Sequence, residues 1–332
     1  MINFRTELTL PPSSNLIDHT TNLLTMGSCF SNSIGEKLSE NKFKCQVNSF
    51  GTVFNPISIH KLIDLCISKT MPAENTYIFN EGVWKNHLFH SSFFAKTEVE
   101  LEKKIKKSID SVHDFLSTTN YLILTYGTAF VYEKLDSQEI VANCHKEPAS
   151  KFKKRLLTVE EILKSFNSIH SKLLRVNPTL KVILTISPIR HTKDTFELNT
   201  VSKSILRLAT HNLKEQVDID YFSAYELMMD DLRDYRFYEA DMIHPNQQAI
   251  DYIWNKFADR YFSVYTKEVI KKWHVLRVAL NHKPFNSEGE LHRKFLMQAL
   301  QQLTELKSVI NVDSELKQLE IQILNQNAQP PH

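Results

Sequence analysis

The chain contains the stretch LLTMGSCFSN at residues 23–32, in which a short apolar run meets the start of a helical pattern. Residues 22–26 have the composition of a short buried strand, which Gly27 ends. Ser28 therefore stands between a first strand and a first helix, where free N–H groups can stabilise a developing anion. The same pattern also suits an ordinary turn with a helix-capping serine. A catalytic role for Ser28 therefore depends on partners supplied by the rest of the chain.

The composition is that of a globular protein and excludes several classes of function. A chain of 332 residues can form one large domain with an extension, or two small domains. Forty basic and 38 acidic residues give a formal charge of +2, which indicates no nucleic-acid or anionic-membrane partner. Four widely spaced cysteines lack a Cys-x-x-Cys pair, so we expect no metal site. Only six glycines are present and no dinucleotide or P-loop motif occurs, so we expect no cofactor.

The beginning of the chain has no targeting pattern. Residues 1–7 contain no apolar segment typical of a signal peptide, and no run of eighteen apolar residues occurs anywhere. We therefore expect a cytoplasmic protein with no membrane span.

Short apolar runs alternate with helical patterns about five times between residues 22 and 262. The runs predicted as strands are residues 22–26, 45–50, 121–126, 181–186 and 219–222. This alternation predicts an α/β fold, a three-layer α/β/α arrangement around an open parallel sheet.

Two insertions and an extension complete the predicted organisation. Within a domain of residues 1–262, an aromatic segment at about 71–95 is expected to form a small hairpin or irregular insertion, and a second hairpin is expected after residue 130. Two apolar helical stripes predict a helical extension at 263–317, broken near residues 281–286, and we expect residues 318–332 to be frayed. The apolar faces of this extension must pack on the core or on a second copy in a homodimer.

The loops that follow the predicted strands carry most of the reactive side chains. In a parallel sheet these loops lie at one edge, which would gather Ser28, Gly51, Gly127, Thr128, Arg190, Asp241 and His244. A nucleophilic serine needs a base, a group that orients the base, and oxyanion donors. Asp241-x-x-His244 can place a carboxylate on one imidazole nitrogen while the other nitrogen faces the serine. The N–H groups of Ser28 and Gly51 are the expected oxyanion donors.

Several motifs together resemble one known family. Residues 27–31, GSCFS, are similar to the signature that names the GSCFA family, with serine in place of the usual alanine. Further similar pieces follow in the family's order at residues 48–56, 125–129, 143–146, 187–191 and 241–246. The family is similar to the SGNH (GDSL-type) hydrolases, which implies an SGNH/flavodoxin-like sheet. The resemblance also implies that Ser28 is the nucleophile, His244 the base and Asp241 its orienting carboxylate, with Gly51 at the second oxyanion position.

One position departs from the SGNH pattern. These enzymes usually place an oxyanion-donating asparagine two residues after the glycine of their third sequence block. That glycine corresponds to Gly127 here, and the position two residues later is Ala129. Thr128 or Asn143 could substitute for it.

Other polar side chains keep two interpretations each. His145 and Arg190 either face the cleft and bind an acyl or anionic group of the substrate, or connect loops. We interpret Cys29 as a small buried residue behind Ser28 rather than a nucleophile. His87, His90 and His191 lack the spacing of metal ligands and are expected to be structural or on the surface.

Three hypotheses of function follow from these residues. The first is an esterase that cleaves a carbohydrate or small acyl ester through an acyl-enzyme on Ser28. The second is an acyltransferase that uses the same site, favoured if the aromatic insertion excludes water. The third is a non-catalytic binding protein on a degenerate hydrolase fold, which the alanine at position 129 motivates.

Overall fold

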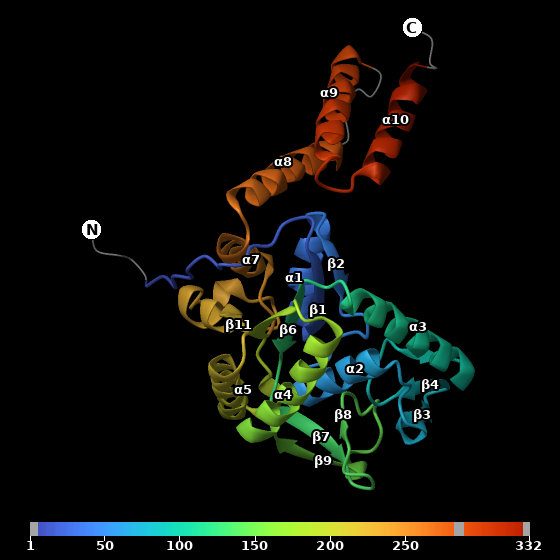
Figure 1. The fold of residues 1–332 in the computed structure, drawn as a ribbon, viewed down its shortest axis with the longest axis vertical. Coiled ribbons are helices and arrows are strands. Elements are labelled where there is room, and N and C mark those ends of the chain that lie inside the picture. Colours follow the sequence, from blue (N-terminus) through green and yellow to red (C-terminus); the bar gives the residue numbers. More distant parts are fainter. Residues whose placement is uncertain (1–5, 282–288, 328–332) are drawn as a thin grey trace. The chain divides into compact units, whose positions relative to one another are not determined.

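The computed structural model describes residues 6–281 and 289–327, and Figure 1 traces their path. The chain forms two compact units. The first contains the described residues up to Leu10, together with Asn22–Lys37 and Cys45–Phe257. The second contains Pro11–Thr21, Leu38–Lys44 and the described residues from Ala258 onward.

A five-stranded sheet forms the centre of the first unit. Its order is β11-β10-β6-β1-β2, with bounds β1 (Asn22–Gly27), β2 (Lys44–Val47), β6 (Tyr121–Tyr126), β10 (Lys181–Ile186) and β11 (Asp220–Phe222). Strands β1, β6, β10 and β11 pair in parallel, with Leu24 opposite Leu122 and Leu124 opposite Leu184. The predicted parallel sheet is therefore confirmed. The strand expected at 45–50 is shorter, because Asn48 takes a positive φ of 40° and turns the chain.

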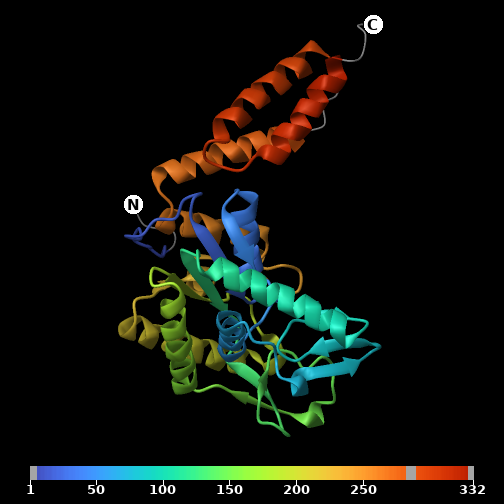
Figure 2. The same ribbon diagram turned by 45° about the vertical axis from the view of Figure 1, so that its right-hand side comes forward.

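Helices cover both faces of the sheet. Successive side chains of each strand point to opposite faces, so apolar strands need cover on both. The helices are α1 (Cys29–Glu40), α2 (Pro56–Ser68), α3 (Glu98–Leu116), α4 (Val159–Val176), α5 (Phe196–Gln216) and α7 (Gln247–Tyr261). Helix α2 packs against α3 and α4, and α4 packs against α5 (Figure 2). These helices share one core with Leu24, Leu122 and Leu184. The ring of Phe222 meets Phe257 of α7 on the other face.

Local sequence explains where three of these helices begin. Thr97 with Glu100 and Thr158 with Glu161 form complete capping boxes before α3 and α4. Asn55 accepts a hydrogen bond from the N–H of Ser58 at the start of α2. These caps satisfy otherwise unpaired N–H groups and so fix where the three helices start.

Two small antiparallel sheets form the insertions. One has the order β3-β4-β5, with β3 (Tyr77–Asn80), β4 (Val83–Asn86) and β5 (Phe94–Ala95). The other has the order β8-β7-β9, with β7 (Phe130–Lys134), β8 (Ile140–Val141) and β9 (Phe152–Leu156). Strands β7 and β9 lie side by side in Figure 1 and pair from Phe130–Leu156 to Lys134–Phe152. Both expected hairpins are therefore present.

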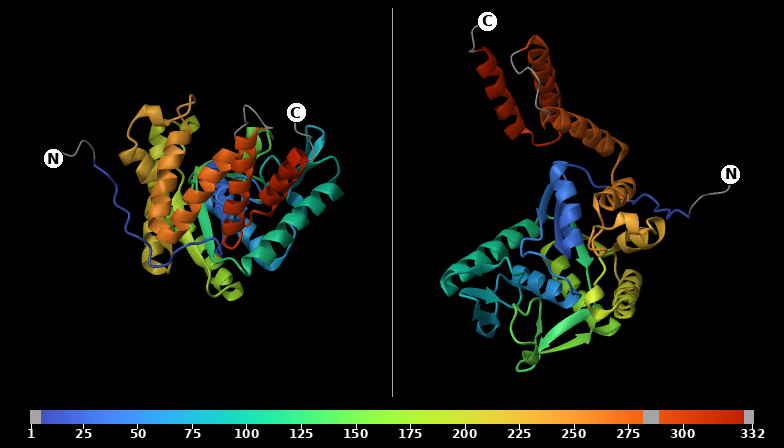
Figure 3. Two further views of the ribbon diagram at one scale, coloured as in Figure 1. Left: turned by 90° about the horizontal axis from the view of Figure 1, so that it is seen from above. Right: turned by 180° about the vertical axis from the view of Figure 1, so that it is seen from behind.

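Helices dominate the second unit. It contains α8 (Val264–Asn281), α9 (Glu290–Leu306) and α10 (Asp313–Asn327), drawn in orange and red in Figure 3. Their apolar side chains form a separate core around Trp273, Leu303 and Leu319. The frayed tail expected from residue 318 is wrong up to Asn327, because α10 buries Leu316 and Leu319 in this core. The break expected near 281–286 falls mostly outside the described residues, as do residues 328–332.

Among the described helices, none combines the length and apolar character that crossing a bilayer requires. The homodimer expected through the C-terminal helices stays a prediction.

Gly27 offers a direct test of how tightly the sheet is packed. Its φ is +142°, and a Cβ at this position would overlap the carbonyl oxygen of Thr125 on the neighbouring strand. We expect Gly27→Ala to lower the free energy of unfolding by at least about 3 kcal/mol, from a strained backbone and overpacking together. Gly82→Ala is the matched control, because Gly82 also has a positive φ (+77°) but no atom within 4 Å of the added methyl group. Urea denaturation that gave both variants the same loss would contradict this packing.

Candidate active site

The end of β1 is held by hydrogen bonds from two segments, β6 and the loop after β2. The N–H of Gly27 donates to Asn48 Oδ1 at 2.8 Å, and its carbonyl accepts from the N–H of Val53 at 2.9 Å. The N–H of Ser28 donates to the carbonyl of Thr125 at 3.1 Å. The turn that carries Ser28 is therefore fixed by β6 and by the loop after β2.

Ser28 immediately precedes α1, the helix that follows β1. Its carbonyl accepts the N–H of Ser31 at 2.8 Å, which closes the first turn of α1. The side chain is fully buried, and Ser28 Oγ has no hydrogen-bond partner in the described residues. The buried hydroxyls of Thr25, Ser31 and Thr185 share this property, so it does not by itself mark Ser28 as reactive. The N-terminal turn of a helix beside it supplies N–H groups that no intrahelical carbonyl accepts.

Asp241 and His244 form a closed pair in one loop. Asp241 Oδ1 accepts the N–H groups of Ile243 and His244 at 2.8 and 3.0 Å, and Asp241 Oδ2 lies 2.7 Å from His244 Nδ1. These hydrogen bonds, first from the His244 backbone and side chain and then from Ile243, lower the pKa of Asp241 to about 2. The carboxylate is thus ionised at neutral pH. Because a carboxylate only accepts hydrogen bonds, this contact favours the tautomer with the proton on Nδ1 and a lone pair on Nε2.

The loops that carry Ser28 and His244 are connected through the segment after β10. Arg190 donates its N–H to the carbonyl of Ile243 at 3.2 Å. The ring of His191 meets Phe54 at a centroid distance of 5.7 Å, and burial, followed by nearby Lys203 and His244, lowers its pKa to about 4. Within the described residues, no hydrogen bond joins Ser28 Oγ to His244. The Asp241–His244 loop thus contacts the segment after β10, and the serine–histidine contact is not formed.

The expected oxyanion donors are all engaged in backbone hydrogen bonds. Gly51 donates its N–H to the carbonyl of Asn48 at 2.7 Å. Gly127 and Thr128 both donate to the carbonyl of Phe54, at 2.7 and 3.1 Å. Ser28 donates to Thr125, as described above. A preformed oxyanion hole made of these N–H groups is therefore absent from this conformation of the described chain.

The backbone of Ala129, which stands where the SGNH pattern has asparagine, is bonded to α5. Ala129 is buried, and its N–H donates to Ser202 Oγ at 2.8 Å. Thr128 Oγ1 lies 3.0 Å from the same oxygen. The hydroxyl of Thr128 is thus turned to α5 and bonded there, so its predicted role as a substitute donor is not seen in this conformation.

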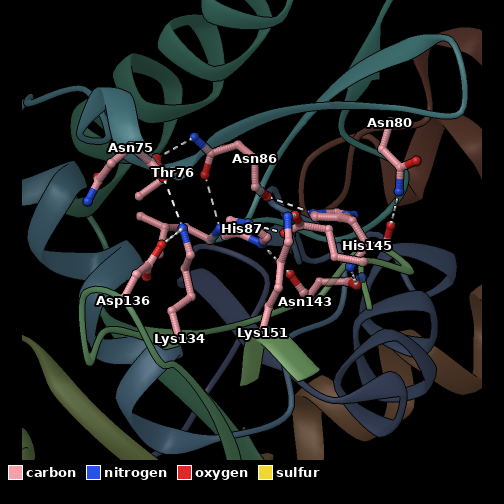
Figure 4. A network of polar contacts seen from close by, with 12 residues as sticks. Asn75, Thr76, Asn80, Asn86, His87, Lys134, Asp136, Asn143, His145 and Lys151 are labelled. Carbon is pink, nitrogen blue, oxygen red and sulfur yellow. Dashed lines mark hydrogen bonds and ion pairs between the residues drawn. The ribbon is translucent and has the colours of Figure 1, made fainter. Parts of the chain in front are cut away.

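Asn143 and His145 lie in a polar network between the two insertions (Figure 4). His145 is buried, its Nε2 lies 2.8 Å from the carbonyl of Asn86, and its N–H donates to Asn143 Oδ1 at 2.8 Å. Burial lowers the pKa of His145 to about 4. The Asn143 carbonyl lies 3.0 Å from Nδ1 of buried His87. These contacts match the interpretation of His145 as a residue that connects loops.

The thiols near the site are poor candidates for a nucleophile. Burial raises the pKa of Cys29, and burial together with nearby Glu147 raises the pKa of Cys144 to about 11. Both thiols are therefore protonated at neutral pH, whereas a nucleophilic cysteine needs a lowered pKa.

Sequence reasoning missed a buried lysine behind the site. Lys203 of α5 is 1% exposed, and its Nζ donates to the carbonyls of Gly127 and Ser187, each at 2.7 Å. Burial lowers its pKa to about 7. The amine ties together the carboxyl ends of β6 and β10. The sequence gives no signal for this role, because a lysine in an amphipathic helix usually lies on the solvent side.

A pH series can detect this buried amine. Between about pH 7 and 10.5, Lys203 is neutral in the folded chain but protonated in the unfolded chain, so the unfolded state binds more protons. Its contribution to the free energy of unfolding must therefore rise with pH in this window, by up to about 1.4 kcal/mol per pH unit. We expect urea denaturation to show this rise in the wild type and not in Lys203→Gln, which keeps two donors but cannot titrate. Lys214→Gln, at an exposed position of α5, should behave as the wild type. Parallel pH curves for the wild type and Lys203→Gln would contradict the assignment.

Comparison with known families gives two matches. The model of the GSCFA family matches residues 22–257, and that of the GSCFA domain protein, C-terminal domain, matches residues 273–325. No protein with a curated description matches the chain.

Several solved structures are similar at low sequence identity. A family 3 carbohydrate esterase from Talaromyces cellulolyticus is 9% identical, with a TM-score of 0.34 over 76% of this chain and 98% of the other. An acetyl xylan esterase from the rumen bacterium Butyrivibrio proteoclasticus is 11% identical, with a TM-score of 0.35 over 78% of this chain and 67% of the other.

Proposed function

The chain belongs to the GSCFA family, and we propose that it is a serine hydrolase that cleaves a carbohydrate or small acyl ester through an acyl-enzyme on Ser28. One observation carries the proposal. Asp241 and His244 form a hydrogen-bonded pair in a loop at the sheet edge where buried Ser28 has an unpartnered hydroxyl. A base, its orienting carboxylate and a serine at a helix N-terminus are the parts that acyl transfer to serine needs.

The proposed mechanism begins with a movement of the Asp241–His244 loop. Both side chains are almost half exposed, so the pair can approach the serine as a unit. His244 Nε2 then accepts the proton of Ser28 Oγ as the oxygen attacks the ester carbonyl. Asp241 stabilises the imidazolium that forms. The ring returns the proton to the departing alcohol, and a water molecule later releases the acyl group by the same steps.

The negative charge on the carbonyl oxygen has to be stabilised during the attack. The first turn of α1 supports this step, because N–H groups at a helix N-terminus, apart from that of Ser31 here, lack an intrahelical acceptor and the helix dipole favours an anion. The N–H groups of Gly127 and Thr128 can contribute only after they leave the carbonyl of Phe54. We therefore expect a slow enzyme in the conformation described, with one fewer donor than the SGNH pattern provides.

A fluorophosphonate probe tests the nucleophile. We expect covalent labelling of the wild type at Ser28, because phosphonates react only with activated serines, and complete loss of labelling in Ser28→Ala. Ser31→Ala is the matched control: Ser31 is also buried in α1, and its hydroxyl also lacks a partner. Intact-protein and peptide mass spectrometry would locate the label. Labelling that survived Ser28→Ala, or an unlabelled wild type that turns over no ester, would reject the proposal in favour of a binding protein.

Acyl transfer is the second candidate, favoured by the complete burial of Ser28. An acyl-enzyme that water reaches poorly would last long enough to meet another alcohol.

Turnover of p-nitrophenyl acetate separates the two reactions. If the protein is a transferase, release of p-nitrophenol should be slow in buffer and faster when a sugar acceptor is added, with acetylated sugar detected by mass spectrometry. Ser28→Ala should abolish both effects. A rate that is unchanged by the acceptor, with free acetate as the product, would identify a hydrolase.

A further inference from the structure

A cavity of about 290 Å³ lies beside the Asp241–His244 loop, and Arg190 forms part of its wall. The backbone N–H of Arg190 donates to the carbonyl of Ile243 at 3.2 Å, and its Nη1 donates to the carbonyl of Met242 at 3.2 Å. Both acceptors lie between Asp241 and His244 in the sequence. Arg190 therefore both lines the cavity and holds the backbone of the loop that carries His244.

Arg190 is held in place by aromatic rings rather than by a carboxylate. Its guanidinium lies 4.7 Å from the ring centroid of Phe196, 5.1 Å from that of Tyr238 and 5.7 Å from that of Tyr235. No carboxylate of the described residues forms an ion pair with it, whereas Arg233, in the same wall, pairs with Asp230. A guanidinium has five N–H donors, so most of those on Arg190 remain for a ligand. A fixed and unneutralised guanidinium is suited to a carboxylate or phosphate.

The rest of the lining combines polar groups with the apolar side chains of Met228, Met229 and Leu232. Asn199, Thr200 and Tyr225 bring amide, hydroxyl and aromatic groups to the wall. Asp234 also lines the cavity, but Arg236 pairs with it at 3.1 Å. The volume is just below the range for ligand pockets, about 300–1,000 Å³, and is large enough for one sugar unit rather than a chain of them.

Contacts also lead from this cavity toward the serine. Asn199 in the wall accepts the N–H of His191 at 2.9 Å through its side-chain oxygen. His191 in turn contacts Phe54, and the adjacent Val53 donates its N–H to Gly27. A ligand in the cavity would thus lie on the same sheet edge as Ser28.

We propose that this cavity binds the alcohol part of the substrate, a sugar that carries an anionic group recognised by Arg190. This inference rests on the proposed function and adds a substrate class to it. A carboxylate and a phosphate share the chemistry that Arg190 recognises, so the ligands below include both.

Binding of unreactive sugars tests the cavity without any chemistry at Ser28. We expect glucuronic acid or glucose 6-phosphate to bind at least about tenfold more tightly than glucose at low salt, because a charge-assisted hydrogen bond to a fixed guanidinium is worth at least that factor. Isothermal titration of both the wild type and Ser28→Ala should give this preference. Stronger binding of one anion identifies the carboxylate or the phosphate as the group recognised.

Two variants decide whether Arg190 is responsible. Arg190→Gln should bring the affinities for anionic and neutral sugars within about twofold of each other, while Arg233→Gln, which removes a paired arginine from the same wall, should keep the preference. Circular dichroism melting would establish that both variants are folded. Equal binding of charged and neutral sugars by the wild type, or a preference that survives Arg190→Gln, would overturn the inference. Because these ligands cannot acylate Ser28, that result is independent of the phosphonate experiment.

Discussion

The close approach of Gly27 to Thr125 is the constraint on which the candidate site depends. Only a residue without a side chain can bring the end of β1 this near the backbone of β6 and still take a φ of +142°. Asn48 completes the constraint, since it accepts the N–H of Gly27 while its own φ of 40° turns the chain away from β2. Asparagine tolerates this left-handed conformation better than most residues. Ser28 therefore has a fixed backbone position before any substrate or catalytic partner is considered.

The proposed mechanism has two requirements, a fixed position for Ser28 and activation of its hydroxyl, and the structure lets us consider them separately. The backbone of Ser28, the nucleophile that we propose, is already fixed, because both hydrogen-bonding groups of the Gly27–Ser28 peptide are paired, with Val53 and with Thr125. Activation is incomplete, because His244 makes no hydrogen bond to Ser28 Oγ. The pairing of Asp241 with His244 is already in place, so the proposed base needs only the approach of that loop. The oxyanion donors need a separate change, because their N–H groups are bonded to backbone carbonyls.

The sequence predicts elements better than it predicts which hydrogen bonds they make. Strand ends and capping boxes are local, so the parallel sheet and the edge that carries Ser28 could be predicted from apolar runs and Thr-x-x-Glu patterns. The Asp241–His244 contact is also local, at a spacing of three residues. In contrast, the N–H of Gly51 is taken by Asn48, and Ala129 is bonded to Ser202 in a distant helix. Such contacts depend on tertiary packing, which no local pattern encodes.

The segment Val53–Phe54 makes hydrogen bonds both to Gly27, beside the serine, and to the Gly127–Thr128 loop after β6. The position of this segment therefore determines whether the N–H groups of that loop can form an oxyanion hole. In the Gly127–Thr128 peptide, the carbonyl of Gly127 accepts from Lys203 while the N–H of Thr128 donates to Phe54, so the peptide plane is held from both sides. Lys203 is buried and donates to carbonyls at two strand ends. Moving the Gly127 carbonyl away from it would leave a buried donor unsatisfied, which costs free energy. Phe54 belongs to a loop and supplies a single carbonyl for two donors. A shift of Phe54 would therefore free the N–H groups of Gly127 and Thr128 together, while Lys203 still fixes the direction of the Thr128 N–H through the Gly127 carbonyl.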